Sequence, residues 1–357
     1  MAAGLAPDRY RPLVVLPGPG DLAGDLRASG VAVEVCDLAV LRRALFSPTG
    51  LARVAARAAA DAVTLGRLAR SRGVALVHSN TSVTLGGAAA ARAARVPHVW
   101  SVREIYADFP RWWPAYRRVL GAGGDAFACS SQAVLAQFGG DPRARVVHEG
   151  VTAAAARRDR ATAREALALP ADAFVCAVLG RISPWKGQDV LARALAAPSL
   201  HDAGAIGVLA GDAWAGEERH ERALRDLAAE LGLGERLRMV GFQEDPAIVY
   251  GAADVVVVPS TQPDPLPNAA LEAAAAGCCL VAAAHGGLPE IVRDGETGVL
   301  VPPRDADALA AALTALAGDP DRRARLGAAA AADVAERFSV ARLLDRVQAL
   351  YDELLDG

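Results

Sequence analysis

The stretch from Asp254 to Gly298 restricts the possible folds of this chain more than any other part of the sequence. It begins with four valines at 255–258, which predict a strand buried on both faces because β-branched residues dominate such strands. A proline-rich loop at 262–267 follows, and an alanine-rich helix is predicted from about residue 267 to residue 276. A second buried strand is predicted at 278–284. Strands that alternate with helices in this way indicate a doubly wound parallel sheet.

Two acids of this stretch are expected to meet at one edge of the sheet. Asp264 lies in the loop before the helix, and Glu272 lies about one turn inside the helix. The second strand leads to Gly286 and Gly287, whose loop is expected at the same edge because ligands of such sheets bind outside the carboxyl ends of the strands. The free N–H groups of the first helical turn favour an anion there. Two carboxylates around a phosphate-sized space suit a ligand with phosphate in its middle and hydroxyl groups at both ends, such as a nucleotide sugar.

The residues D-P-L-P-N-A-A-L-E, 264–272, resemble the E-x7-E signature of the family 4 retaining glycosyltransferases. The following G-C-C-L-V-A-A-A-H-G-G-L-P-E-I-V-R-D-G-E-T-G-V-L-V-P-P resembles the same family, and Asp264 stands where Glu is more usual. The resemblance implies the GT-B fold, an α/β architecture of two Rossmann-like, doubly wound parallel-sheet domains with a cleft between them.

The resemblance also implies the limits of the domains. An acceptor-side domain is expected at 1–155, a nucleotide-sugar donor domain at 156–337, and a terminal helix at 338–357 that returns to the first domain. Family members usually begin with a βα unit whose Gly-Gly loop faces the acceptor. This chain is expected to lack that unit, since its first predicted strand, 13–16, resembles the family's second unit. Either the true start lies upstream or the acceptor domain is reduced.

Two cations follow the strand predicted at 174–179. Arg181 and Lys186 lie in the loop G-R-I-S-P-W-K-G, which resembles the family's G-R-x3-x-K-G element. Because both leave a strand end on a short loop before a helix, they are expected to reach the same crevice as the two acids. Two fixed cations and helix N–H groups would stabilise a departing nucleoside diphosphate. The alternative is a pair of surface cations that flank a turn.

The strand predicted at 237–241 leads to Phe242, which resembles the family's nucleobase contact. The resemblance implies a UDP- or GDP-linked sugar as co-substrate and no other cofactor. The catalytic candidates are Arg103, Arg181, Lys186, Asp264 and Glu272. The donor-binding candidates are Gly180, Phe242, Pro265, Leu266, Pro267, Asn268, Glu272, Gly286 and Gly287.

Polar residues also follow two strands predicted in the first half of the chain. The strand at 74–77 ends in H-S-N-T and the strand at 97–102 ends in R-E, so both deliver polar groups to a sheet edge. The candidate residues are His78, Asn80, Arg103 and Glu104. The alternative is that they cap the next helix or pair with one another. Family members place a His or an Arg-Glu pair near the donor sugar, so the resemblance implies a role for Arg103 there.

The segment F-P-R-W-W-P-A-Y-R-R, 109–118, interleaves aromatic residues with arginines. Such a segment suits an acceptor wall or a membrane surface, because amphipathic rings and cations fit a headgroup layer. We favour the other interpretation, in which a helix starts here and its Trp rings pack in the core.

Two weaker motifs favour structural roles. Gly18, Gly20 and Ala23 match a dinucleotide fingerprint with Glu34 and Asp37 as ribose acids, but so short a match favours a plain βα turn. Two D-x-D sequences, at 305–307 and 319–321, are predicted to be N-caps and turns because they precede helices. No His or Cys cluster has metal-ligand spacing, so no metal site is predicted.

Composition excludes several classes of protein. A formal net charge of −3 gives no support to nucleic-acid binding. There is no signal-peptide core near the start and no apolar run that approaches about 18 residues, so no membrane span is predicted. The five cysteines, at 36, 129, 176, 278 and 279, form no C-x-x-C pair and are expected as small buried residues in a reducing cytoplasm.

These patterns predict a metal-independent retaining glycosyltransferase that moves a sugar from a nucleoside diphosphate to an acceptor hydroxyl. The acceptor is expected to be a polysaccharide, a lipid-linked molecule or a small molecule, and the enzyme is placed in the cytoplasm with peripheral contact to the inner face of the membrane as an option. The resemblance implies that the leaving phosphate itself helps to deprotonate the acceptor. Two alternatives stay open: another GT-B reaction, such as a phosphorylase or a nucleotide-sugar epimerase, and a nucleotide-sugar-binding protein that has lost catalysis.

Overall fold

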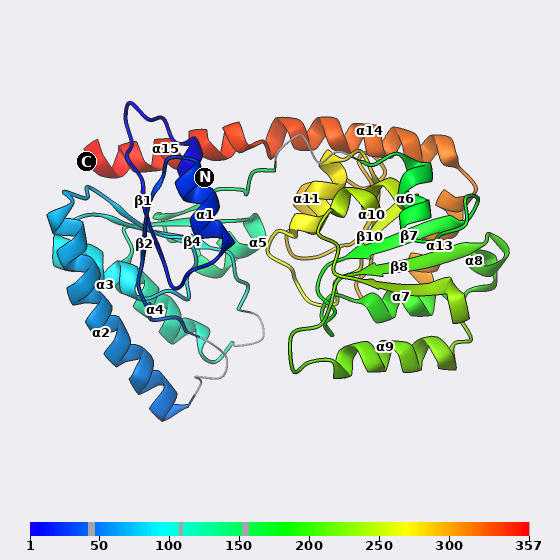
Figure 1. Cartoon of the computed structure of the whole chain (residues 1–357), viewed down its shortest axis with the longest axis horizontal. Helices are drawn as coiled ribbons and strands as arrows, with labels where there is room; N and C mark the ends of the chain where they lie inside the picture. Colours follow the sequence, from blue (N-terminus) through cyan, green and yellow to red (C-terminus); the bar gives the residue numbers. More distant parts are fainter. Residues whose placement is uncertain (42–46, 107–109, 152–156, 357) are drawn as a thin grey trace. The chain divides into compact units, whose positions relative to one another are not determined.

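The computed structural model describes residues 1–41, 47–106, 110–151 and 157–356, except the side chain of Pro48. The chain forms two compact α/β units (Figure 1). Residues 1–149 and 340–357 make up the first unit, and residues 150–339 make up the second. The polar, Ala- and Arg-rich stretch 152–162, which the sequence predicts to be the linker between the domains, lies partly outside the described residues.

The second unit is built on a six-stranded parallel sheet with the strand order β12-β11-β10-β7-β8-β9. Its strands are β7 (Phe174–Leu179), β8 (Ala205–Ala210), β9 (Leu237–Gly241), β10 (Val255–Val258), β11 (Cys279–Ala283) and β12 (Val299–Val301). The chain builds the sheet outward from β7 to β9 and then returns to the other side of β7 with β10. The strand order therefore reverses between β7 and β10, which is the position where doubly wound sheets bind ligands.

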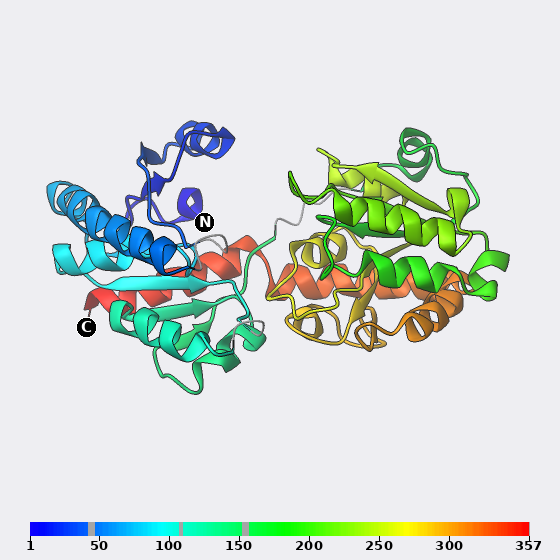
Figure 2. The ribbon, with the colours of Figure 1, turned by 90° about the horizontal axis from the view of Figure 1, so that it is seen from below.

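Helices cover both faces of this sheet, as Figures 1 and 2 show. They are α6 (Arg160–Ala166), α7 (Gln188–Leu195), α8 (Pro198–Asp202), α9 (Arg219–Glu230), α10 (Pro246–Ala252), α11 (Asn268–Ala275), α12 (Leu288–Ile291), α13 (Ala306–Ala317) and α14 (Pro320–Arg337). In β10, Val255 and Val257 join the core beneath α7 and α13, whereas Val256 and Val258 join the core beneath α10 and α11. Burial on both faces explains why this strand consists of valine alone.

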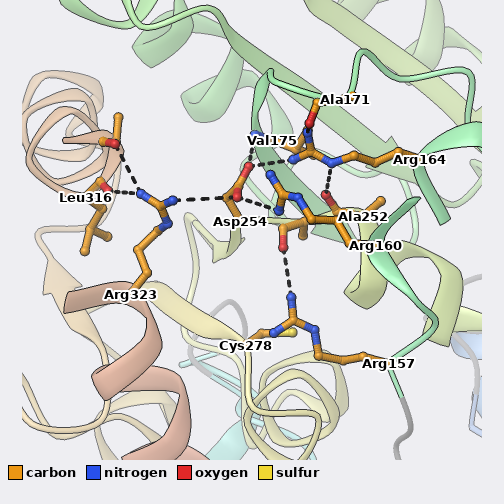
Figure 3. A network of polar contacts seen from close by, with 12 residues as sticks. Arg157, Arg160, Arg164, Ala171, Val175, Ala252, Asp254, Cys278, Leu316 and Arg323 are labelled. Atoms are coloured by element: carbon orange, nitrogen blue, oxygen red, sulfur yellow. Dashed lines mark hydrogen bonds and ion pairs between the residues drawn. The ribbon is translucent and has the colours of Figure 1, made fainter. Parts of the chain in front are cut away.

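Asp254, just before β10, anchors the amino end of the sheet (Figure 3). Its side chain is 5% exposed and lies 2.8 Å from Arg164 of α6 and 2.7 Å from Arg160. It also accepts a hydrogen bond from the backbone N–H of Val175, and Arg323 of α14 lies 3.8 Å away. This buried cluster joins two helices to the sheet at the end opposite the loops that follow the strands.

The first unit contains two parallel sheets, one of β1 and β2 and one of β3-β4-β5-β6. The strands are β1 (Leu13–Leu16), β2 (Ala32–Val35), β3 (Val77–Ser79), β4 (His98–Val102), β5 (Ala126–Cys129) and β6 (Ala144–Val146). The helices are α1 (Asp21–Ala28), α2 (Pro48–Ser71), α3 (Gly86–Ala94), α4 (Trp113–Gly123), α5 (Gln132–Leu135) and α15 (Val340–Asp356). The short 3₁₀ helix Ala2–Gly4 precedes them.

The terminal helix α15 covers one face of the four-stranded sheet (Figure 1). Its residues Val347, Leu350 and Tyr351 are buried with Val99 of β4 and Ala126 of β5. Alternate residues of the same strands, such as Trp100 and Phe127, face a second core that includes residues of α3, α4 and α5. Side chains alternate between the two faces of a strand, so one face of this sheet packs against α15 and the other against α3, α4 and α5. The terminal helix therefore belongs to the first unit.

The limits predicted for the strand at 74–77 are wrong. The structure places β3 at Val77–Ser79, so His78 lies within the strand and not after it. His78 Nδ1 lies 2.5 Å from the Tyr351 hydroxyl and its Nε2 lies 2.8 Å from Ser101 Oγ. Burial lowers the pKa of His78 to about 3. His78 is therefore a partly buried, neutral contact to the terminal helix.

Candidate active site

Lys186 and Asp264 form an ion pair across the point where the strand order reverses. Lys186 lies in the loop after β7 and Asp264 in the loop after β10, and Lys186 Nζ is 2.8 Å from Asp264 Oδ2. The Asp264 side chain is 8% exposed and that of Lys186 is 20% exposed. The prediction that the cation loop and the first acid share one edge of the sheet is therefore confirmed.

Lys186 is the only lysine of the sequence, although lysines and arginines together number 38. Every other cationic side chain of these two types is an arginine. A lysine ammonium is a compact point charge, whereas a guanidinium is a planar fork with five donors. The position beside Asp264 therefore takes the compact cation in a chain that otherwise uses the planar one.

Backbone contacts hold the two loops together. The N–H of Thr261 donates to Trp185 O at 2.8 Å, and its hydroxyl donates to Pro184 O at 3.0 Å. Gly187 has φ of +74°, and a Cβ atom there would lie 1.9 Å from Pro259 O. Only glycine fits this close approach, so the loop that carries Lys186 is fixed directly against the end of β10.

Gly286 and Gly287, in the loop after β11, pack against the backbone of the Asp264 loop. A Cβ atom on Gly286 would lie 2.4 Å from Asp264 O, and one on Gly287 would lie 2.0 Å from Pro265 O. The N–H of Gly287 donates to Asp264 O at 2.8 Å. These glycines therefore contact the backbone of the loop that carries Asp264 and hold that loop in place.

Glu272 lies one turn inside α11, as predicted. The Tyr250 hydroxyl donates to Glu272 Oε2 at 2.9 Å. Within the described residues, Glu272 Oε1 receives no hydrogen bond, so one carboxylate oxygen is fixed and the other is available to a ligand. No side chain caps α11 at Pro267, which leaves the first-turn N–H groups of Asn268 and Ala269 for an anion.

Arg181 contacts an aromatic ring that the sequence analysis did not single out. Its Cζ lies 3.7 Å from the centroid of the Trp214 ring, while Lys186 Nζ lies 4.2 Å from that of Trp185. No carboxylate in the described ranges forms an ion pair with Arg181. Partial burial alone lowers the pKa of Arg181 from its usual range. The signal that could have found Trp214 is its place in G-D-A-W, the loop that follows the apolar run of β8.

The remaining donor-binding candidates divide by exposure. Phe242 follows β9 and is 70% exposed, and Asn268 is also exposed. Leu266 and Pro267 are buried. Gly180 directly follows β7, has φ of +137° and donates its N–H to Ala210 O.

In the first unit, Glu104 Oε2 accepts from the backbone N–H of Arg103 at 3.0 Å, while within the described residues the two side chains pair with other residues. Arg103 Nε lies 2.8 Å from Glu149 Oε1, and its Nη2 donates to Asn80 Oδ1 at 3.1 Å. Glu104 accepts from Ser82 Oγ at 2.6 Å. Burial raises the pKa of Glu149, and the neighbouring Arg103 opposes that shift. Glu149 had no sequence signal beyond its place after a strand.

Two rings of the aromatic segment 109–118, those of Trp113 and Tyr116, are partly buried, whereas its other described residues are exposed and Phe109 lies outside the described residues. The Trp113 ring stacks on Tyr106 at 4.7 Å, and the Tyr116 hydroxyl donates to Ser82 O at 2.6 Å. Trp112 is 52% exposed. The favoured interpretation, a helix start with packed rings, is therefore confirmed for Trp113 and Tyr116.

The two D-x-D sequences begin helices, as predicted. Asp305 and Asp319 each cap a helix, by accepting from the N–H groups of Ala308 and Arg322 at 2.8 Å. The acids near the glycine turn form ion pairs, Glu34 with Arg72 and Asp37 with Arg57. The five cysteines are free thiols, and four of them are buried. Among described residues, no group of three His, Cys, Asp or Glu side chains is arranged to hold a metal ion.

No helix within the described ranges has both the length and the apolar character that crossing a bilayer requires.

Comparison with known families matches both halves of the chain. The family described as "Glycosyl transferases group 1" matches residues 159–333, and "Glycosyltransferase Family 4" matches residues 1–154. A D-inositol 3-phosphate glycosyltransferase of Saccharomonospora viridis is 43% identical over 203 residues, which are 55% of this chain and 46% of that protein. Its namesake in Streptomyces bingchenggensis is 37% identical over 234 residues, 63% of this chain and 51% of that protein. The chain spans about half the length of the curated relatives it matches.

Solved structures resemble the chain over nearly its whole length. Anabaena HepE in complex with UDP-glucose has a TM-score of 0.82 and 26% identity, with 98% of this chain and 93% of that chain covered. HepE in complex with UDP has a TM-score of 0.81 and 27% identity, over 96% and 92% of the two chains. Sucrose-phosphate synthase from Thermosynechococcus elongatus, 23% identical with a TM-score of 0.75 over 96% of each chain, shares the fold. The two Rossmann-like units thus form a GT-B fold.

Proposed function

The chain belongs to glycosyltransferase family 4, and from this premise we propose that it moves a sugar from a nucleoside-diphosphate sugar to the hydroxyl group of an acceptor. The observation that carries the proposal is the Lys186–Asp264 pair at the reversal point of the six-stranded sheet. Arg181 lies in the same loop as Lys186 and forms no ion pair within the described residues. A donor of this kind needs cations for its diphosphate and acceptors for its sugar hydroxyls. Both lie within one set of loops.

Each residue has a distinct task in this proposal. Arg181 and Lys186 bind the diphosphate and stabilise its charge as the bond from the anomeric carbon to phosphate breaks. Asp264 accepts hydrogen bonds from the sugar, and Glu272 accepts them from the ribose through its free oxygen. Phe242 contacts the nucleobase. Arg103 of the first unit completes the proposed catalytic set.

The proposed transfer retains the anomeric configuration. The acceptor oxygen attacks from the face that the phosphate leaves, and the departing phosphate oxygen takes the acceptor's proton. No separate protein base is required, and the two cations supply the charge that a divalent metal would otherwise supply. Support for this route comes from the family assignment and from the cations at the site.

We propose UDP as the first donor nucleotide to test, with GDP second, because HepE was solved with UDP and UDP-glucose. The proposed acceptor is a polysaccharide, a lipid-linked molecule or a small molecule. D-inositol 3-phosphate belongs in the acceptor panel because the name of the curated relatives contains it.

We place the reaction in the cytoplasm, where nucleotide sugars and reduced thiols coexist. Contact with the inner face of a membrane is proposed through exposed residues near the start of α4, namely Arg111, Trp112, Arg118 and Val119. Flotation with anionic vesicles tests this part, and an equal distribution with neutral and anionic vesicles contradicts it.

The decisive experiment measures release of nucleoside diphosphate and formation of glycosylated acceptor, after a thermal-shift panel of UDP-, GDP- and ADP-sugars has selected the donor. Transfer is expected only when acceptor is present. Isomerised or hydrolysed donor without acceptor would instead indicate an epimerase. Sugar phosphate formed from a glycoside and phosphate would indicate a phosphorylase. Donor that binds and never turns over with any acceptor would indicate a binding protein.

A further inference from the structure

The guanidinium of Arg181 is held by an indole ring. Its Cζ lies 3.7 Å from the centroid of the Trp214 ring, well inside the range of cation–π contacts. No carboxylate in the part of the chain that the structure describes forms an ion pair with it. The ring face contacts the guanidinium carbon, and the N–H groups of Arg181 donate no hydrogen bond within the described residues, so they stay available to a ligand.

The backbone fixes the loop of Trp214 against the loop of Arg181. Gly180 and Gly211 both have φ of +137°, and a Cβ atom on Gly211 would lie 2.3 Å from Gly180 O. The N–H of Ile182 donates to Asp212 O at 3.1 Å. These contacts bring the loops after β7 and β8 close together. The side chain of Trp214, two residues after Asp212, can therefore reach Arg181.

Two carboxylates fix the far side of the same loop. The N–H of Ala213 donates to Glu221 Oε1 at 2.9 Å, and that of Gly216 donates to Glu218 Oε1 at 2.8 Å. Trp214 lies between these anchored residues, yet it is 60% exposed. Because the ring is held over Arg181 while most of its surface faces water, burial in a core does not account for its position.

We propose that Trp214 is a positioning residue, which holds the Arg181 guanidinium in the orientation that receives the diphosphate of the donor. The proposal rests on the proposed function, since it requires a diphosphate at Arg181. An arginine side chain has many rotamers, and ordering it costs free energy on binding. A ring that orders the guanidinium beforehand removes part of that cost and so increases the affinity for the diphosphate.

The test measures UDP affinity by calorimetry in the wild type, Trp214→Ala, Arg181→Ala and the double variant. Trp214→Ala is expected to weaken UDP binding about three- to tenfold, the range expected for a cation–π contact that is partly exposed. Trp214→Phe keeps a ring face and is expected to stay within about threefold of the wild type. In the Arg181→Ala background, Trp214→Ala is expected to have no further effect, because coupled residues are not additive.

Trp112→Ala is the matched control, since Trp112 is 52% exposed and lies in the other unit. Its UDP affinity and that of the wild type are expected to agree. An equal loss from Trp214→Ala with and without Arg181 would mean that the ring touches UDP itself, and the inference would be overturned. It would also be overturned if Trp214→Ala bound UDP like the wild type while Arg181→Ala did not. A wild-type protein that binds neither UDP nor GDP would instead contradict the proposed function.

Discussion

Lys186 and Asp264 neutralise each other across the reversal point of the sheet, with Nζ 2.8 Å from Oδ2. The proposed function assigns them to different parts of the donor, the phosphate and the sugar. A donor must therefore enter between two side chains, Lys186 and Asp264, that already form an ion pair with each other. The ion pair keeps a nearly buried carboxylate paired until the ligand arrives, and it aligns both groups at the bond that breaks.

Lys186→Ala is expected to lower kcat about a hundredfold or more, because losing one preorganised charge at a developing anion costs about 3 kcal/mol. Steady-state kinetics with saturating donor measure this effect. Arg193→Ala, on the exposed side of α7, is the control and is expected to leave kcat unchanged. A Lys186→Ala enzyme within about threefold of the wild type would remove Lys186 from the mechanism.

Because Lys186 is the sole lysine, the same prediction has a chemical readout. An amine-selective reagent can modify only Lys186 and the terminal amine, and peptide mass spectrometry separates the two. UDP is expected to protect Lys186 and not the terminal amine. Equal modification rates with and without saturating UDP would contradict contact between Lys186 and the diphosphate.

Transfer is expected to continue at an unchanged rate in excess EDTA, because Arg181 and Lys186 supply the positive charge at the leaving group. Product formation is followed before and after the chelator is added. Activity that stops in EDTA and returns with Mg²⁺ or Mn²⁺ would show that a metal takes part.

Asp254→Ala is expected to destabilise the second unit by about 3–5 kcal/mol, because it leaves the buried guanidinium of Arg164 without its carboxylate. The side chains of Asp254 and Arg164 are 5% and 3% exposed. Urea denaturation measures the free energy of unfolding. Arg160→Ala is the control, since its side chain is 47% exposed and surface pairs contribute at most about 1 kcal/mol. If both variants lost the same free energy of unfolding, the assignment of Asp254 and Arg164 as a buried pair would be contradicted.

The first unit is expected to lose stability in mild acid. Burial lowers the pKa of His78 to about 3 and that of His98 to about 4, whereas both are near 6.5 in the unfolded chain. Between these values the unfolded state binds more protons, so stability falls as pH drops below about 6.5. Together, the two histidines are expected to lower the free energy of unfolding by about 4 kcal/mol between pH 7.5 and pH 5. Urea denaturation at both pH values measures this, and imidazole NMR signals of His78 and His98 that titrate near 6.5 would contradict it.

The strands that the sequence predicted best are continuous apolar runs. The limits of β7 and β10 agree with the predicted 174–179 and 255–258, because strands buried on both faces are apolar throughout. The limits of β9 also agree with the predicted 237–241, although this strand contains Arg238 and is only partly buried. The limits of β3 were missed, because the position of this strand depends on the contact between His78 and Tyr351. Tyr351 belongs to a helix far along the chain. Such a contact has no local pattern.

The site shows the same division. The loops of Arg181 and Asp264 were predicted to share an edge because strand order and loop position follow from the βα alternation. Trp214 was missed, because its reach to Arg181 depends on how closely Gly180 and Gly211 approach. The direct pairing of Lys186 with Asp264 likewise has no local sequence pattern, because the two residues are 78 positions apart. The predicted absence of the family's first βα unit stays a prediction.

Glu272→Gln is expected to raise the donor KM about tenfold with little change in kcat. The ribose hydroxyls that Glu272 binds do not change during transfer, so the interaction is equal in the ground and transition states. A charge-assisted hydrogen bond contributes about 1.5–3 kcal/mol. Tyr250→Phe, which releases Glu272 Oε2, is expected to raise KM by a smaller factor and to leave kcat unchanged.

Asp264→Asn is expected to do the opposite, lowering kcat while leaving UDP binding intact. Asp264 contacts the sugar where positive charge builds at the anomeric carbon, and free UDP has no sugar. The substitution also frees Lys186 from its partner, so UDP should bind at least as tightly as to the wild type. Calorimetry of UDP with both variants, run beside the kinetics, separates the two acids without assuming that KM equals affinity. Should Glu272→Gln bind UDP as well as Asp264→Asn does, the assignment of the ribose to Glu272 is wrong.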